Sequence, residues 1–144
     1  MKSYILVIDD EALVRQALTQ VLEHRGYEVQ CAPDGRQGLR AFHMRRPDLV
    51  ISDIIMPEME GIETIMELRI LSRDCPIIAM SGGGRLGKAD FLTAAMELGA
   101  TASLRKPFET AELLRTIAGC LAGNSAGPTR STRPPELMLG IDAQ

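Results

Sequence analysis

Cysteine is scarce in this sequence, and its spacing excludes two kinds of structural cross-link. The 144 residues include three cysteines, Cys31, Cys75 and Cys120. An odd number of widely separated cysteines forms neither a closed disulfide framework nor the ligand spacing of a zinc site. Such usage is typical of a reducing compartment, so we expect a cytoplasmic protein whose thiols are inert core groups.

Long apolar runs and a strong excess of either charge are also missing. No stretch approaches the roughly 18 apolar residues of a membrane-spanning helix. The N-terminal run from Tyr4 to Ile8 is followed by three acids, and it is too short for the apolar region of a secretory signal. A net charge of −3 argues against a surface that coats nucleic acid. We therefore expect neither a membrane nor a nucleic acid as the partner.

The residues that are present describe an ordinary globular domain. Apolar residues make up 45% and charged residues 24% of the chain, which is usual for a protein with one sizeable core. Apolar runs predict four strands, a weakly alternating segment predicts one more that lies nearer an edge of the sheet, and apolar residues at helical spacing predict five helices. The strands are 4–8, 27–32, 48–52, 77–80 and 102–104, and the helices are 11–25, 35–45 with Asp34 as its cap, 62–72, 89–98 and 109–121.

Strict alternation of strands and helices predicts the fold class. Short right-handed crossovers of this kind give a parallel sheet with helices on both faces, a three-layer α/β sandwich. The composition changes near residue 123, where Gly, Pro, Ser, Thr and Arg become frequent. We expect a domain over 1–122 and a flexible tail or linker remnant over 123–144.

Polar side chains follow four of the predicted strands, at the edge where reactive groups of parallel sheets gather. If the first and third strands are neighbours, the carboxylates of Asp9, Asp10 and Asp53 converge there. Two carboxylates about 4 Å apart repel by on the order of 4 kcal/mol at an effective dielectric near 20, and a bound cation relieves this. Oxygen ligands with open positions suit Mg²⁺.

Ser81 and Lys106 approach the same edge from the fourth and fifth strands. A carboxylate held beside Mg²⁺ and an ammonium can act as a nucleophile toward phosphorus. The glycines after Ser81 leave backbone N–H groups accessible, although the segment lacks the spacing and lysine of a P-loop.

Each of these residues also has an ordinary explanation when taken singly. Asp10 is a favoured helix cap, Asp53 a turn residue, Ser81 a loop hydroxyl and Lys106 a solvated cation. His24 and His43 lie on helices and are interpreted as surface or packing residues. The combination of three acids, a serine and a lysine at one edge is what favours a site.

The combined motifs resemble the receiver domain of two-component response regulators, in particular the single-domain, chemotaxis-regulator-like type. The motifs are VIDDE after the first strand, SDIIMPEMEG after the third, MSG after the fourth and RKPF after the fifth. The resemblance covers about residues 1–122. It implies a flavodoxin-like (βα)5 fold with strand order 2-1-3-4-5.

The resemblance also implies a role for each site residue. Asp53 would be the phosphoacceptor. Asp10, Asp53 and the backbone carbonyl of Ile55 would hold Mg²⁺, with Asp9 acting through a water. Ser81 would be the switch hydroxyl and Lys106 the phosphoryl contact, with a cis bond before Pro107.

The implied partners are a sensor histidine kinase or histidine phosphotransfer protein, and a downstream protein bound at the helix 89–98, strand 102–104, helix 109–121 face. The implied partners also include a second copy of the chain, in a homodimer formed on phosphorylation. We expect no DNA-binding output domain, and the implied protein is a phosphoacceptor that assists its own phosphorylation and dephosphorylation rather than an enzyme.

Two positions bear on how such a switch would work. The family usually has an aromatic residue where this chain has Ser103, so we expect coupling to run through the 81–84 loop and helix 89–98. Ile55 is placed to screen the phosphoryl group from water, and we expect it to slow dephosphorylation. Three alternatives stay open: a Mg²⁺-dependent phosphohydrolase, a binding module without phosphorylation, and a fragment of a longer regulator.

Overall fold

The computed structural model describes residues 2–54, 61–82 and 88–126. Strands and helices alternate along the chain, as the sequence pattern predicts. The strands are β1 Tyr4–Ile8, β2 Glu28–Ala32, β3 Leu49–Asp53, β4 Ile77–Ser81 and β5 Ala102–Arg105. The helices are α1 Ala12–His24, α2 Gly35–Met44, α3 Gly61–Leu71, α4 Lys88–Leu98 and α5 Thr110–Ala126.

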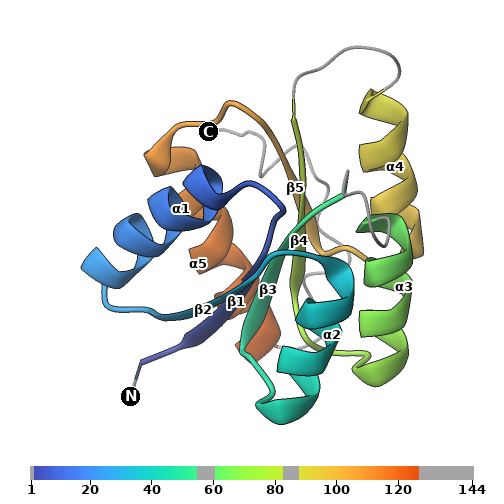
Figure 1. Ribbon diagram of the computed structural model, residues 1–144, viewed down its shortest axis with the longest axis horizontal. Coiled ribbons are helices and arrows are strands. Elements are labelled where there is room, and N and C mark those ends of the chain that lie inside the picture. Colours follow the sequence, from blue (N-terminus) through green and yellow to red (C-terminus); the bar gives the residue numbers. More distant parts are fainter. Residues whose placement is uncertain (1, 55–60, 83–87, 127–144) are drawn as a thin grey trace.

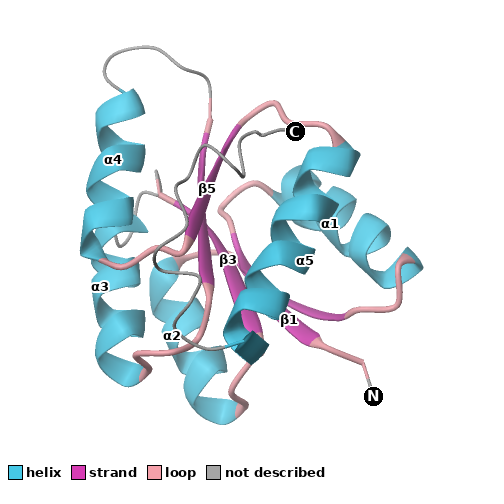
Figure 2. Cartoon of the chain, turned by 180° about the vertical axis from the view of Figure 1, so that it is seen from behind, coloured by secondary structure: helices cyan, strands magenta, loops and turns pink. Residues whose placement is uncertain are grey.

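The five strands form one parallel sheet in the order β2-β1-β3-β4-β5. Helices α1 and α5 cover one face of the sheet, and α2, α3 and α4 cover the other (Figures 1 and 2). This is the three-layer flavodoxin-like α/β sandwich that was expected. The predicted edge position of the second strand is confirmed.

Two apolar clusters fill the space on the two sides of the sheet, because successive strand residues point to opposite faces. Leu6 and Ile8 pack with Phe42 and Ile65 beneath α2, α3 and α4. Ile5 and Val7 pack toward α1 and α5. The three central strands β1, β3 and β4 are buried at every position, as continuous apolar runs in a doubly covered sheet should be.

Helix ends follow local signals in the sequence. The Asp34 side chain accepts a hydrogen bond from the backbone N–H of Gln37, so it caps α2 as predicted. Gly26 follows α1 with a φ of +92°, the left-handed region that favours glycine. Helix α5 continues to Ala126, five residues beyond its predicted end at 121, so residues 123–126 are helical.

Candidate phosphoacceptor site

The acidic residues that follow β1 and end β3 come together because these two strands are neighbours in the sheet. Ile8 of β1 lies opposite Ser52 of β3, so the next residues, Asp9 and Asp53, emerge side by side. One carboxylate oxygen from each of Asp9, Asp10 and Asp53 lies within 4.8 Å of the others. Asp9 and Asp53 are buried, and Asp10 is exposed.

Asp9 is held from several directions. One of its carboxylate oxygens accepts a hydrogen bond from the backbone N–H of Glu11 at 2.9 Å. Its backbone carbonyl accepts one from the Arg15 guanidinium at 2.8 Å. Glu11 ends the VIDDE motif and Arg15 lies in α1, but the sequence assigned neither a role, because both contacts depend on how the chain turns between β1 and α1. The N-cap position of α1 is Glu11, so Asp10 does not cap this helix.

Lys106 supplies a cation to the three acids. Its ammonium nitrogen lies 3.0 Å from Asp9 Oδ2, 3.6 Å from Asp53 Oδ2 and 4.0 Å from a Glu11 carboxylate oxygen. Burial by itself lowers the pKa of Lys106, but its hydrogen bond to Asp9 and the charges of Asp53, Asp9 and Glu11 outweigh burial and raise the pKa above 10.5. Lys106 is therefore a fixed positive charge at neutral pH.

Ser81 is the last residue of β4, and its hydroxyl is fully buried and has no hydrogen-bond partner among the described residues. The backbone of the same residue is bonded, because its carbonyl accepts from the N–H of Lys106 at 2.7 Å. A buried hydroxyl without a partner is rare and costs free energy. The Ser81 hydroxyl therefore has unused hydrogen-bonding capacity at the end of β4, the strand that pairs with β3.

The remaining predicted positions have mixed outcomes. The peptide bond between Lys106 and Pro107 is cis, as the resemblance implied. Ser103 lies on β5 with its side chain exposed. Ile55 and Gly84 lie outside the described residues. Gly61, which opens α3, packs so closely on Ile54 that a side chain would overlap the Ile54 backbone, so the start of α3 lies against the residue that follows β3.

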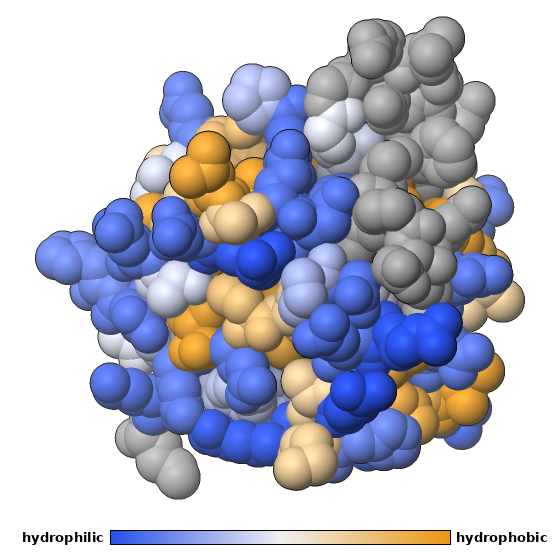
Figure 3. Space-filling view, viewed as in Figure 1, coloured by the Kyte–Doolittle hydropathy of each residue, from blue (hydrophilic) through white to orange (hydrophobic). Residues whose placement is uncertain are grey.

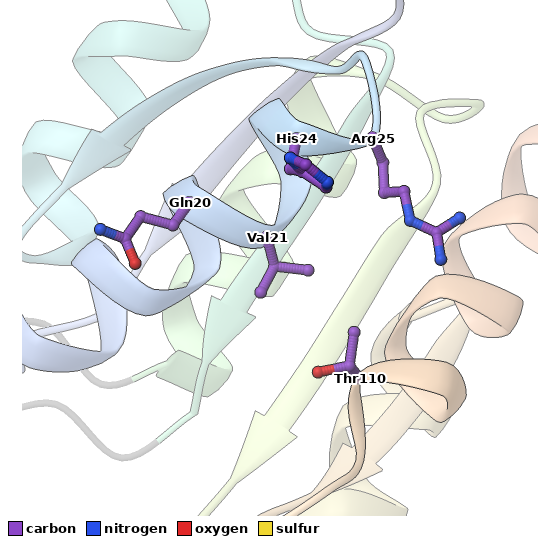
Figure 4. A pocket seen from close by; sticks show the side chains of 5 residues that line it. All are labelled: Gln20, Val21, His24, Arg25 and Thr110. Carbon is purple, nitrogen blue, oxygen red and sulfur yellow. The ribbon is translucent and has the colours of Figure 1, made fainter.

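A separate shallow pocket lies between α1 and α5, away from the acids. It has a volume of about 410 Å³ and is lined by Gln20, Val21, His24, Arg25 and Thr110 (Figure 4). None of the predicted site residues contributes to it. His24 and His43 are both exposed, which agrees with their interpretation as surface residues. Within the described residues, no helix combines the length and apolar character needed to cross a membrane.

Known proteins share both the sequence pattern and this architecture. The family model of the response regulator receiver domain matches residues 5–118. The response regulator MprA of Mycolicibacterium vanbaalenii is 36% identical over 88% of this chain and 57% of its own length. The probable transcriptional regulator ycf27 of Cyanophora paradoxa is 39% identical over 97% of this chain and 58% of its own length. The chain thus spans little more than half of these curated relatives.

Solved structures give the same result. A response regulator receiver domain protein from Clostridium thermocellum superposes with a TM-score of 0.77 at 33% identity, covering 83% of this chain and 94% of that one. A CheY-like receiver domain protein from Methanospirillum hungatei gives 0.80 at 28% identity, covering 88% of this chain and 98% of that one. With its sheet order, its acidic edge and these matches, the chain belongs to the response regulator receiver domain family of two-component systems.

Proposed function

We propose that this chain is a phosphorylation-controlled switch in which Asp53 accepts a phosphoryl group. The donor would be a phosphohistidine on a sensor kinase or phosphotransfer protein. An Asp53 carboxylate oxygen forms a bond to phosphorus while the bond from phosphorus to the donor imidazole nitrogen breaks. One observation carries the proposal: Asp53 lies beside two further carboxylates and the Lys106 ammonium, and the strand paired with β3 ends in Ser81, whose buried hydroxyl has no partner among the described residues.

The acid cluster fits a hard divalent cation. Oxygen ligands from three carboxylates within 4.8 Å of one another, one of them exposed to water, are the donor set that Mg²⁺ prefers. In the proposal Asp10, Asp53 and the Ile55 carbonyl hold the ion directly, and Asp9 holds it through a water. Mg²⁺, when bound, supplies positive charge that stabilises the transferring phosphoryl group.

Lys106 and Ser81 have complementary roles around the phosphoryl group. The Lys106 ammonium, 3.6 Å from Asp53 Oδ2, offsets the negative charge that phosphorylation adds at this carboxylate. Ser81 donates its hydroxyl hydrogen to a phosphoryl oxygen and so gains the partner that it lacks. Because Ser81 ends β4, this bond pulls on the segment that leads into α4, which is the candidate two-state element.

The output would be a change in protein contacts at the α4-β5-α5 face. Ser103 exposes a small hydroxyl on β5, so the response is expected to travel through the segment between β4 and α4. In this proposal the chain acts in the cytoplasm and assists its own phosphorylation and dephosphorylation rather than turning over a substrate. Which domain or partner receives the signal stays a prediction, since the matched relatives are longer than this chain.

Intact-mass spectrometry after incubation with acetyl phosphate and Mg²⁺ tests the assignment. We expect the wild type to gain one phosphoryl group, Asp53→Asn to gain none, and labelling to require Mg²⁺. Asp74→Asn is the matched control, because Asp74 is an exposed acid that should be dispensable. Labelling that persists in Asp53→Asn would overturn the assignment, and multiple turnover of small phosphate esters would favour the phosphohydrolase instead.

A further inference from the structure

Helices α2 and α3 lie next to each other on the same face of the sheet and carry opposite charges (Figure 1). Helix α2 contains no acidic residue, and its exposed side chains include Arg36, Arg40 and His43. The two arginines that follow it have partners already. Arg45 pairs with Glu28, and Arg46 lies over the Phe42 ring. The outer side of α2 therefore presents Arg36 and Arg40 as available cations.

The outer side of α3 presents anions at matching positions. Glu63 and Glu67 are exposed and one helical turn apart. Within the part of the chain that the structure describes, no ion pair involves Arg36, Arg40, Glu63 or Glu67. The two helices thus hold complementary charges that do not neutralise each other by direct contact inside one copy.

Exposed apolar side chains gather on the same two helices. Met44 at the end of α2 is 81% exposed, and Ile70 near the end of α3 is 76% exposed. Met66 on α3 is also exposed. In the described ranges, three of the five exposed large apolar residues therefore lie on these two helices. Figure 3 shows apolar side chains at the lower right, where α3 lies in Figure 1. An apolar group rimmed by charge is typical of a protein contact.

The charged and apolar residues follow the same order along both helices. Both helices start from the carboxyl edge of the sheet and run in the same direction (Figures 1 and 2). Arg36, Arg40 and Met44 are the second, sixth and tenth residues of α2, and Glu63, Glu67 and Ile70 are the third, seventh and tenth residues of α3. A two-fold axis parallel to the helices would preserve this order.

We propose that the α2–α3 face binds a second copy of this chain in a symmetric dimer, with α2 of each copy lying on α3 of the other. Arg36 then meets the partner's Glu63, Arg40 meets the partner's Glu67, and Met44 packs on the partner's Ile70. Charge favours this occupant, because an acidic peptide or a nucleic acid attracted to α2 would be repelled by α3. This inference does not depend on phosphorylation of Asp53.

The dimer is expected to be weak and sensitive to salt. Helices of ten and eleven residues are only about 15 Å long at 1.5 Å per residue, so the contact belongs to the small, transient class. Its ion pairs are exposed and are screened at high ionic strength. Sedimentation equilibrium of the full chain at low salt, up to roughly millimolar concentration, should give a mass that rises above 15.7 kDa and falls back when salt is added.

Charge reversal with mixing gives the decisive test. Arg40→Glu and Glu67→Arg each place two like-charge contacts in the symmetric dimer, and each should weaken self-association by at least about tenfold. Mixed together, the two variants restore both attractive contacts, so the mixture should associate more strongly than either variant alone. Arg36→Glu and Glu63→Arg provide an independent second pair.

Arg25→Glu is the matched control for net charge. Arg25 is exposed at the end of α1, on the opposite face of the sheet and outside the α4-β5-α5 face, so this variant should associate as the wild type does. Circular dichroism confirms that each variant is folded. The proposal is overturned if the wild type stays monomeric at low salt, if Arg25→Glu weakens association as much as Arg40→Glu, or if the mixture is no heavier than its components.

Discussion

Asp53 is a carboxylate at the end of an apolar strand, and its position there costs free energy. Asp53 is only 5% exposed, and its carboxylate lies close to those of Asp9 and Asp10. Asp53→Asn should therefore raise the melting temperature of the metal-free protein in EDTA. A gain of 1 kcal/mol in unfolding free energy corresponds to a rise of about 4 °C for a domain of this size. Mg²⁺ should stabilise the wild type and have little effect on the variant.

Differential scanning calorimetry with and without Mg²⁺ measures both effects. Asp74→Asn, at an exposed acid outside the site, should respond to Mg²⁺ as the wild type does. If Mg²⁺ leaves the wild-type melting temperature unchanged, the acid cluster is not a cation site.

Lys106 balances an otherwise uncompensated charge, because Asp9 is fully buried and lies 3.0 Å from the ammonium. Lys106→Met should destabilise the metal-free protein by about 3 kcal/mol, the cost of leaving one member of a buried ion pair alone. The pKa of Lys106 is raised in the folded state, so its contribution is fully present below about pH 10.5 and is lost as the pH rises through the folded-state pKa.

Urea unfolding at pH 7 and at increasing pH above 10 tests this prediction. The wild type should lose more stability than Lys106→Met over the alkaline range, so that the two curves approach each other. Arg105→Met, at the exposed neighbouring position, should cost much less at pH 7. Equal costs for the two substitutions would mean that the Asp9 contact is unimportant.

At the scale of the elements, the sequence predicted the features that depend on local pattern. Apolar runs and one weakly alternating segment located the strands, and Asp34 caps α2 through Gln37 as expected. The rule that reactive groups lie at the carboxyl ends of parallel strands predicted that Asp9, Asp53 and Lys106 lie close together, as they do. The end of α5 was not predictable from pattern, because residues 122–126 lack an apolar repeat. The helix continues there because extending an existing helix by a few residues costs little free energy.

Features of the site that depend on side-chain packing could not be read from the sequence. Nothing in the motifs shows that Lys106 lies closer to Asp9 than to Asp53. The motifs likewise do not show that the Ser81 hydroxyl has no hydrogen-bond partner among the described residues. Both distinctions require three-dimensional register and rotamers, which spacing alone does not specify.

Arg69 connects three elements through backbone carbonyls. Its guanidinium donates to Gly99 after α4, to Ser72 after α3 and to Cys75 before β4, at distances from 2.5 to 3.1 Å. Gly99 has a φ of +129°, and a side chain there would crowd Arg69. Arg69→Ala should cost about 2 kcal/mol, because several charged hydrogen bonds to partly buried carbonyls are lost.

Arg69→Lys distinguishes the geometry of these bonds from charge alone. A lysine keeps the charge but lacks the planar guanidinium that reaches three separate carbonyls. Arg69→Lys should therefore recover less than half of the unfolding free energy that Arg69→Ala loses, as measured by urea unfolding. Arg73→Ala, at an exposed position nearby, should be close to neutral. A lysine variant as stable as the wild type would show that the connection between α3, β4 and α4 does not depend on the guanidinium.

At the scale of the whole molecule, the described members of both apolar clusters lie before the end of α5. On the α1 and α5 side, Leu113, Ile117 and Cys120 are the contributions of α5. On the other side, the last buried member is Ala100. The buried apolar residues of the described chain thus end at Cys120, six residues before the end of α5 at Ala126.

A chain ending at Ala126 should therefore fold with a melting temperature within about 2 °C of the full chain, because it keeps every described member of both apolar clusters. It should also keep the Mg²⁺ response and the labelling of Asp53. A chain ending at Glu112 should fail to fold, because it loses Leu113, Ile117 and Cys120 from the core. A large loss of stability on removing 127–144 would instead assign those residues to the folded domain. An unchanged melting temperature would direct the search for their role to partner binding.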